Sequence, residues 1–334
     1  MNEHEIISAM KSALDVSHER DADFGEHISA QPALIVSSVD RAKHGTAPPC
    51  EPLDIWAFRA VNAAVSDLAC AGVTAAFIQI DAQIPAHLNY EDVMAVGRGI
   101  ALAIDTLGIR LINGNNTTIG PLGLTTVAQG WRSIEPRPPG RAGATAGDWL
   151  VCSRLPGRFT SALDALAAGD EPGWLSEALL GGVVELEVGR CLVDNGIASA
   201  LIDANDCLLL TVRDLARASG VGIWLDRESL ETAAATVAWM PSMESMLAPP
   251  SGDLALIASV PDQRIDELRS IFRDLGRTPV LAGRIVDGAG EVSVDGWDDR
   301  GLDEVAARRW HAAAPVRYPV DDVRALLRAG VRAW

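Results

Sequence analysis

Acidic and amide side chains interrupt apolar runs at three places in this chain, and side chains of these types can bind a cation or a phosphate. Ser66 and Asp67 lie inside the apolar run 60–76. The stretch 113–121, Asn-Gly-Asn-Asn-Thr-Thr-Ile-Gly-Pro, separates two strand-like runs, and the segment 203–206, Asp-Ala-Asn-Asp, follows a short apolar run. Such side chains are costly in apolar surroundings unless they are paired or hold a ligand. The three segments therefore predict a shared metal or phosphate site.

The stretch 113–121 is predicted to be a tight polar loop, because clusters of Asn, Gly and Thr between apolar runs mark turns. Four of its side chains could contact a small charged group through amide and hydroxyl groups; these are Asn115, Asn116, Thr117 and Thr118. Asn116 and Thr117 have a second interpretation, since side chains of these types also stabilise turns by bonding to the backbone.

Three aspartates are candidate metal ligands, and each has a structural alternative. Asp40 ends a predicted strand and could cap a turn instead. Asp67 lies on a predicted helix between apolar neighbours, so we expect a ligand role there rather than a plain solvent-facing position. Asp206 could equally be the N-cap of a helix that begins at Cys207.

Lys43 is a candidate for contacting phosphate. It is one of only two lysines in the chain, and it lies in a loop with glycine and prolines. The Gly-x-x-x-x-Gly-Lys-Ser/Thr phosphate loop is absent. A solvated position is the more common outcome for a charged residue in such a loop, but Lys43 is the only lysine placed to reach a phosphate.

The composition excludes several classes of protein. The formal net charge of −17 argues against nucleic acid as a partner, because binding to a phosphate backbone needs a basic surface. No apolar run reaches the length of a membrane span, and no signal-like stretch is present, so we expect a cytoplasmic protein. The five cysteines form no Cys-x-x-Cys pair, which argues against a disulfide framework and a zinc site.

Strand-like and helix-like segments alternate in both halves of the chain, which predicts an α/β fold. In the first half we expect strands over 33–39, 75–80, 109–112 and 122–131, with helices over 55–71 and 90–107. The Pro- and Gly-rich stretch 133–147 is the best candidate for a domain boundary. In the second half we expect a helix over 207–219 and strands over 149–153, 221–225, 254–260, 279–286 and 291–294.

Six motifs in the same order resemble the superfamily of aminoimidazole ribonucleotide synthetase, selenophosphate synthetase and thiamine-monophosphate kinase, and in particular the last of these. The resemblance runs from about residue 19 to about residue 297. The motifs are Val-Ser-Ser-Val-Asp at 36–40, Ser-Asp-Leu-Ala-Cys-Ala-Gly at 66–72, Asn-Asn-Thr-Thr-Ile-Gly-Pro at 115–121, Arg-Ala-Gly-Ala-Thr-Ala-Gly-Asp at 141–148, Asp-Ala-Asn-Asp-Cys-Leu at 203–208 and Ala-Gly-Arg-Ile at 282–285.

The resemblance implies a two-domain fold. An N-terminal domain, residues 1–140, would dimerise through its sheet and carry the metal and the ATP phosphates. A C-terminal α/β domain would span residues 141–299, followed by a helical extension, residues 300–334. The protein would be a homodimer that acts on a small-molecule substrate.

The resemblance also implies ATP and magnesium as cofactors. Asp21, Asp40, Asp67 and Asp206 would hold magnesium, which prefers carboxylate oxygens and bridges to phosphates. Asp206 and the polar residues 115–118 would contact the nucleotide. Asp67 and Lys43 would act in phosphoryl transfer, which needs mostly positioning and charge neutralisation.

The chain departs from the kinase motifs at several positions. Asn116 replaces a metal-binding aspartate, Ile119 replaces an arginine, and Cys207 replaces a glycine. Three functions are therefore predicted. The first is an ATP- and magnesium-dependent phosphotransferase. The second is a ligase or dehydratase that activates an amide or carboxylate with ATP, and the third is a non-catalytic member that binds a nucleotide or a protein.

Overall fold

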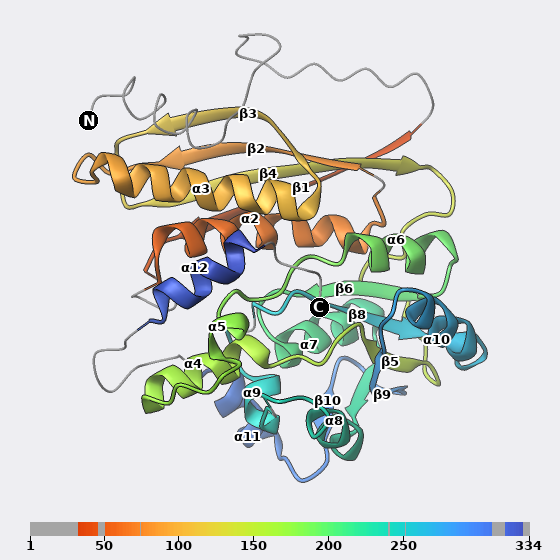
Figure 1. The fold of residues 1–334 in the computed structure, drawn as a ribbon. Coiled ribbons are helices and arrows are strands. Elements are labelled where there is room, and N and C mark those ends of the chain that lie inside the picture. The colour runs from red at the N-terminus through yellow and green to blue at the C-terminus, as the bar shows by residue number, and fades with distance from the viewer. Residues whose placement is uncertain are drawn as a thin grey trace. The chain divides into compact units, whose positions relative to one another are not determined.

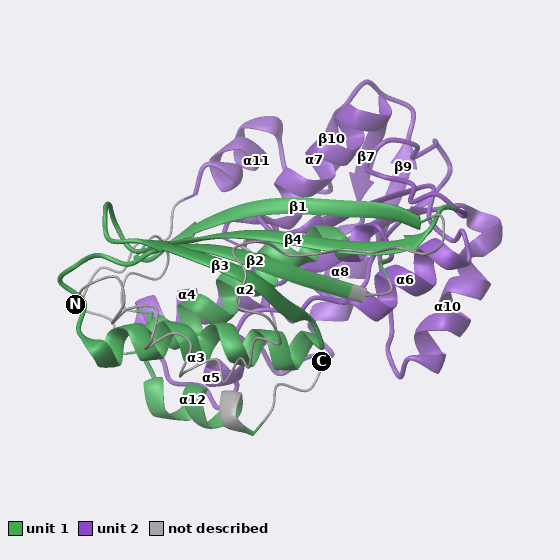
Figure 2. Cartoon of the chain, turned by 90° about the horizontal axis from the view of Figure 1, so that it is seen from above, with its two compact units in different colours: residues 1–68, 73–134, 317–334 green, residues 69–72, 135–316 purple. Residues whose placement is uncertain are grey.

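A computed structural model describes residues 33–45, 51–73, 75–239, 241–250, 252–308 and 318–329. The chain divides into two compact units (Figure 2). Unit 1 takes in residues 1–68, 73–134 and 317–334, and unit 2 takes in residues 69–72 and 135–316. Each unit mixes helices with one sheet, so the predicted α/β fold class is confirmed.

Unit 1 is built on a four-stranded sheet (Figure 1). Its strands are β1 (Ala33–Lys43), β2 (Ala75–Gln83), β3 (Arg110–Thr117) and β4 (Gly123–Ser133), in the order β1-β4-β2-β3. The strand β4 pairs antiparallel with both β1 and β2, while β2 and β3 are parallel. The helices α2 (Leu53–Cys70) and α3 (Tyr90–Leu107) lie on the same side of this sheet.

The two faces of the unit 1 sheet differ in burial. On β4, Leu124, Thr126 and Ala128 are at most 1% exposed, whereas Trp131 is 45% exposed. On β1, Ile35 and Val39 are 66% and 65% exposed. Because successive side chains of a strand point to opposite faces, this alternation separates a buried face from an exposed one. We call them the covered face, which contains Thr126, and the open face, which contains Val39 and Trp131.

The helix α3 has the bounds that its sequence predicts. Asn89 and Asp92 form a capping box at its start, and Gly108 ends it with a left-handed φ of 62°. Inside the helix, Gly99 allows close packing, because a Cβ there would come within 2.1 Å of the carbonyl oxygen of Asp54 on α2. The glycine thus serves helix–helix packing.

The helix α12 (Val320–Arg328) belongs to unit 1. The guanidinium of Arg324 donates to both carboxylate oxygens of Asp54, at 2.7 and 3.2 Å. A bidentate pair of this kind fixes geometry as well as charge. Asp54, in the first turn of α2, is therefore held by an ion pair to α12.

Unit 2 has a six-stranded sheet in the order β10-β7-β9-β5-β8-β6. The strands are β5 (Trp149–Cys152), β6 (Ala200–Ala204), β7 (Gly222–Leu225), β8 (Ala255–Val260), β9 (Val280–Val286) and β10 (Val292–Val294). The helices are α4 (Arg158–Ala168), α5 (Leu175–Ala178), α6 (Leu186–Asp194), α7 (Leu208–Ser219), α8 (Arg227–Ala234), α9 (Met243–Leu247), α10 (Ile265–Asp274) and α11 (Asp299–Ala306).

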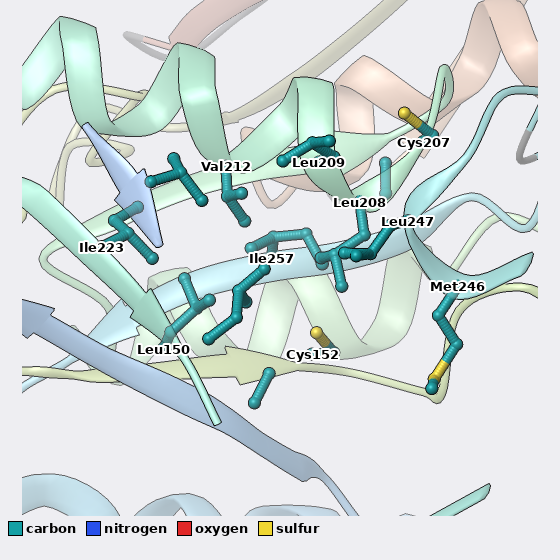
Figure 3. Close-up of a cluster of buried hydrophobic side chains, with 14 of the residues drawn as sticks. Leu150, Cys152, Cys207, Leu208, Leu209, Val212, Ile223, Met246, Leu247 and Ile257 are labelled. Carbon is teal, nitrogen blue, oxygen red and sulfur yellow. The ribbon is translucent and has the colours of Figure 1, made fainter. Parts of the chain in front are cut away.

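The core of unit 2 lies between α7 and its sheet (Figure 3). Leu208 and Val212 on the helix and Ile257 on β8 are fully buried, and they belong to one apolar cluster. Cys152 and Cys207 are buried in the same cluster. The four described cysteines form no disulfide with one another. Within the described ranges, no helix combines the length and the apolar character needed to cross a bilayer.

Two sequence predictions about local structure are wrong. The stretch 113–121 is not one loop, because β3 continues to Thr117 and only residues 118–122 turn. Asp40 does not end a strand, because β1 continues to Lys43. In both cases the extra residues pair with a neighbouring strand, β2 or β4, and this pairing outweighs the low strand propensity of Asn and Gly in β3 and of Asp, Ala and Lys in β1.

Candidate functional site

A hydrogen bond links the two predicted metal ligands of unit 1 through a serine. The hydroxyl of Ser38 on β1 donates to the carboxylate of Asp67 on α2 at 2.5 Å. Ser38 and Asp40 are two residues apart on the same strand, so their side chains share one face, with Cα atoms roughly 7 Å apart. Asp40 and Asp67 therefore lie on the same side of the sheet, close to one another.

Asp67 is exposed, contrary to the expectation that its apolar neighbours would enclose it. On the helix, Val65 and Leu68 are fully buried, and Asp67 occupies the adjacent solvent-facing position. An exposed carboxylate carries no desolvation cost that a ligand must relieve. The argument for Asp67 now rests on its position beside β1 and on its bond to Ser38.

Asp40 lies on the covered face, directly opposite Thr126 of β4. Its carboxylate accepts a hydrogen bond from the backbone N–H of Arg41 at 2.6 Å. Directly opposite residues in an antiparallel pair have Cβ atoms about 5 Å apart. The Thr126 hydroxyl is thus a near neighbour of the Asp40 carboxylate.

Two buried polar atoms on the covered face have no hydrogen-bond partner within the described part of the chain. They are Nδ2 of Asn116 and Oγ1 of Thr126. Asn116 pairs with Ala82 in register, on the same face as Thr126 and Asp40. A buried polar atom without a partner is costly, and such atoms often mark a place where a ligand or water binds.

The donor set of the covered face suits magnesium bound to phosphate. Ser38, Asp40, Asp67 and Thr126 offer only oxygen atoms, which are the ligands that magnesium prefers. The unpaired Asn116 amide can donate to an anionic oxygen. Within the described residues no group of three or more His, Cys, Asp or Glu side chains could hold a metal. Any ion here would therefore take further oxygens from hydroxyls, water or phosphate.

Other predicted residues of unit 1 lie on the open face. Asn115 donates to the carboxylate of Asp81 at 2.8 Å, and the hydroxyl of Thr117 accepts from the backbone N–H of Ile119 at 3.4 Å. Lys43 is exposed at the end of β1, in the alternating set that includes Val39. Strand geometry therefore places Asn115, Thr117 and Lys43 on the opposite face from Asp40.

The polar residues 116–118 differ in role, since the two interpretations of this segment are ligand binding and stabilisation of a turn. Thr117 stabilises the turn after β3, as the alternative for this residue states. Asn116 makes no such bond, and its amide stays free for a ligand within the described structure. Thr118 lies in the turn itself, half-buried. Its role stays a prediction.

In unit 2, Asp206 is exposed and is not the N-cap of the following helix. The cap of α7 is Cys207, whose sulfur accepts from the backbone N–H of Leu210. Burial raises the pKa of the Cys207 thiol to about 11, so it is protonated near neutral pH. Metal or nucleotide binding by Asp206 stays a prediction, and Asp21 lies outside the described residues.

The buried carboxylates of unit 2 have internal partners. Glu185 is paired with Arg154, at 3.0 Å, and with Arg277. Asp253 accepts from the backbone N–H groups of Gly157 and Phe159 at 2.6 and 2.9 Å. These groups hold β5, α4 and neighbouring loops together, so we assign them to the structure of the unit.

Sequence reasoning missed three residues around these strands. Ser38 lies within the motif 36–40, yet only its contact with Asp67 reveals a role. Thr126 is one of two consecutive threonines of β4, and nothing in the sequence tells which of them is buried. Asp81 becomes notable only as the partner of Asn115.

Part of this chain matches a known protein family. Residues 28–130 match the family described as AIR synthase related protein, N-terminal domain. This range includes β1, β2, β3, α2, α3 and most of β4, and it contains Asp40, Asp67, Asn116 and Thr126. This match spans less than half of the chain, and it supports a likeness to the AIR synthase-related superfamily. The resemblance predicted from the six motifs is confirmed.

Two curated members of this superfamily are similar in sequence. The chain is 28% identical to the thiamine-monophosphate kinase of Salmonella typhimurium over 193 residues, which span 55% of this chain and 56% of that kinase. It is 27% identical to the thiamine-monophosphate kinase of Halobacterium salinarum over 239 residues, 72% of this chain and 79% of that kinase. The first alignment thus spans little more than half the length of its relative.

Solved structures of AIR synthase-related proteins share the fold. The thiamine-monophosphate kinase from Stenotrophomonas maltophilia K279a superposes with a TM-score of 0.71 at 24% identity, covering 89% of this chain and 97% of that one. AaThiL complexed with AMPPCP and TMP gives 0.67 at 20% identity, with 89% and 94% coverage. The hydrogenase maturation protein HypE from E. coli gives 0.71 at 19% identity, with 96% and 100% coverage. The fold alone does not separate kinases from HypE.

Proposed function

We propose that this protein is an ATP- and magnesium-dependent phosphotransferase, similar to thiamine-monophosphate kinase, that acts on a small-molecule acceptor. The sequence similarity to two such kinases and the fold of AaThiL, whose structure holds AMPPCP and TMP, support the proposal. The observation that carries it is the Ser38–Asp67 bond, which brings a helix carboxylate beside the covered-face carboxylate Asp40.

Each residue has a defined part in this proposal. Asp40 and Asp67 would hold magnesium, which neutralises phosphate charge when it is bound. Ser38 orients the Asp67 carboxylate by donating to one of its oxygens. The Asn116 amide would donate to an anionic oxygen of the nucleotide. Asp206 is proposed to bind magnesium or nucleotide on the strength of its motif.

A direct experiment is to incubate the purified protein with ATP and magnesium and to follow ADP release with a panel of small hydroxyl- and phosphate-bearing acceptors. We expect release that depends on both magnesium and an acceptor. Asp67→Asn should lower it roughly 100-fold or more, because removing a metal ligand costs several kcal/mol of charge stabilisation.

The matched control is Asp105→Asn, which removes an exposed carboxylate from α3. Its ADP release should equal that of the unmodified protein. If Asp67→Asn and Asp105→Asn behave alike, Asp67 is not part of the site. If calorimetry detects no binding of magnesium and AMPPCP, both enzymatic functions are excluded.

The ligase or dehydratase function keeps support from the fold, because HypE superposes as well as the Stenotrophomonas kinase does. The two enzymatic functions differ in the fate of the phosphate. A kinase leaves it on the acceptor, whereas an amide- or carboxylate-activating enzyme releases it as inorganic phosphate. Measuring phosphorylated product against free phosphate distinguishes them.

The neutral side chain of Asn116 favours the third function, a member that binds nucleotide without turnover. An amide binds divalent cations less strongly than a carboxylate does. Asn116→Asp should then tighten magnesium binding if this residue lines the metal site. Nucleotide binding without ADP release, for every acceptor in the panel, would support the non-catalytic function.

We also propose a homodimer that forms through the open face of the unit 1 sheet. Ile35, Val39 and Trp131 expose large apolar side chains there, and no helix of the described chain covers them. Large exposed apolar side chains on one face of a sheet are typical of a protein–protein interface.

A further inference from the structure

Thr126 is the polar side chain of the covered face that the proposed phosphotransferase mechanism leaves unexplained. It is 1% exposed, and its hydroxyl has no hydrogen-bond partner within the described part of the chain. Valine has almost the same shape, favours strands equally, and would carry no unpaired hydroxyl. A threonine at this position lowers stability unless its hydroxyl forms a hydrogen bond with a group outside the described structure.

The position of Thr126 in the sheet indicates which group its hydroxyl could bind. Thr126 lies directly opposite Asp40, whose carboxylate is one of the two proposed magnesium ligands. On its other side Thr126 pairs with Ile80, which is buried and apolar and offers no partner for a hydroxyl. Of the two strand partners of Thr126, only Asp40 is therefore polar.

A hydroxyl beside a carboxylate would normally donate to it, yet here no such bond forms. The Asp40 carboxylate instead accepts from the backbone N–H of Arg41. Oγ1 of Thr126 and a second oxygen of Asp40 thus stay available in the same place. A hydrated cation, or a cation bound to phosphate, could bind to the Asp40 oxygen and accept a hydrogen bond from the Thr126 hydroxyl.

We propose that the Thr126 hydroxyl is a further ligand-binding group of this site and hydrogen-bonds to an oxygen of the magnesium–phosphate group held at Asp40. This inference rests on the proposed function, since it takes Asp40 as a magnesium ligand. The oxygen belongs either to water on the cation or to the nucleotide phosphate.

The adjacent residue provides a matched control. Thr125 precedes Thr126 on β4, pairs with Arg41 and Asp81, and so points to the open face. Thr126→Val and Thr125→Val make the same chemical change on opposite faces of one strand. Thr126→Ser keeps the hydroxyl and removes only a methyl group.

The experiment measures thermal unfolding without ligand and calorimetric binding of magnesium alone and of magnesium with AMPPCP. Thr126→Val should bind about tenfold more weakly, the effect expected for one hydrogen bond to a charged group. It should also unfold at a temperature roughly 2–4 °C higher, because an unpaired buried hydroxyl is gone. Thr126→Ser should bind like the unmodified protein, and Thr125→Val should leave binding unchanged.

The combination of weaker binding and higher unfolding temperature separates a ligand-binding hydroxyl from a structural one. Loss of binding to magnesium alone assigns the oxygen to the cation's water, and loss only with AMPPCP assigns it to phosphate; both support the proposal. Unchanged binding of Thr126→Val overturns it, since the hydroxyl then contacts only a buried water. A lower unfolding temperature also overturns it, because the hydroxyl then stabilises the fold. If the unmodified protein binds neither magnesium nor AMPPCP, the proposed function fails first, and this inference fails with it.

Discussion

The two faces of the unit 1 sheet carry similar side chains with different surroundings. On the covered face, Asp40 on β1 lies opposite Thr126, whose hydroxyl is unpaired within the described residues, and Asn116 lies on β3, the other edge strand of the sheet. On the open face, Asp81 and Asn115 bond to each other at 2.8 Å. Each face thus holds an aspartate and an asparagine, and among the described residues of this sheet the buried polar atoms without a partner, Nδ2 of Asn116 and Oγ1 of Thr126, lie on the covered face.

This difference shows that residue type alone does not define a site. Asn115 and Asn116 are consecutive in one motif, and strand alternation sends their side chains to opposite faces. One is satisfied by a neighbouring carboxylate, and the other is free for a ligand within the described structure. When a motif lies within a strand, each of its residues therefore has to be assigned to a face of the sheet separately.

The largest expected effect comes from replacing Asp40, and the matched control is Asp81 on the other face of the sheet. Asp40→Asn should weaken magnesium–AMPPCP binding and lower ADP release roughly 100-fold or more, because a cation ligand is lost. Asp81→Asn makes the same change on the open face and should leave both unchanged. Calorimetry and an ADP assay on the two variants test this directly, and equal losses would erase the distinction between the faces.

The open face has its own expected function, which is self-association. Val39 is 65% exposed on β1, on the same face as Ile35 and Trp131. Val39→Asp should convert a dimer to a monomer, since a charge in an apolar interface must lose its hydration on association. Sedimentation equilibrium measures the change. A monomeric unmodified protein would refute the dimer proposal.

The consecutive asparagines offer a smaller effect. Asn116→Ala should weaken magnesium–AMPPCP binding about tenfold, the loss expected for one charge-assisted hydrogen bond. Asn115→Ala should bind normally, because the Asn115 amide is hydrogen-bonded to Asp81 on the open face. Titration of both variants under one condition is sufficient. A reversed order of affinities would assign the site to the open face.

The smallest effect concerns the polar pair Arg41 and Gln83 on the open face, where the guanidinium donates to the amide oxygen at 2.5 Å. Gln83→Ala should change the free energy of unfolding by no more than about 0.5 kcal/mol, as is typical of exposed positions. Urea denaturation measures it. A loss well above that value indicates that this pair is buried against another surface, as in a dimer interface.

The sequence predicts the main elements well where local signals are strong. The helix α3 has its predicted bounds because Asn89 and Gly108 cap it. The turn predicted over 113–121 is wrong in its first half, because pairing with β2 holds Asn and Gly residues in a strand. Long-range pairing of this kind leaves no local trace in the sequence.

The candidate site was predictable only in part. The motif order leads to Asp40 and Asp67, yet the reason given for Asp67, enclosure by apolar neighbours, does not hold for an exposed side chain. The roles of Ser38 and Thr126 depend on which strand and helix face each other. Those contacts arise from tertiary packing, which no spacing within one segment encodes.

The most direct test is to locate a divalent ion by anomalous scattering in crystals grown with manganese and AMPPCP. The account predicts manganese bound by the Asp40 and Asp67 carboxylates on the covered face, with phosphate oxygens near Asn116. Manganese bound only elsewhere, with Asp40 and Asp67 making no contact to it, would contradict the account.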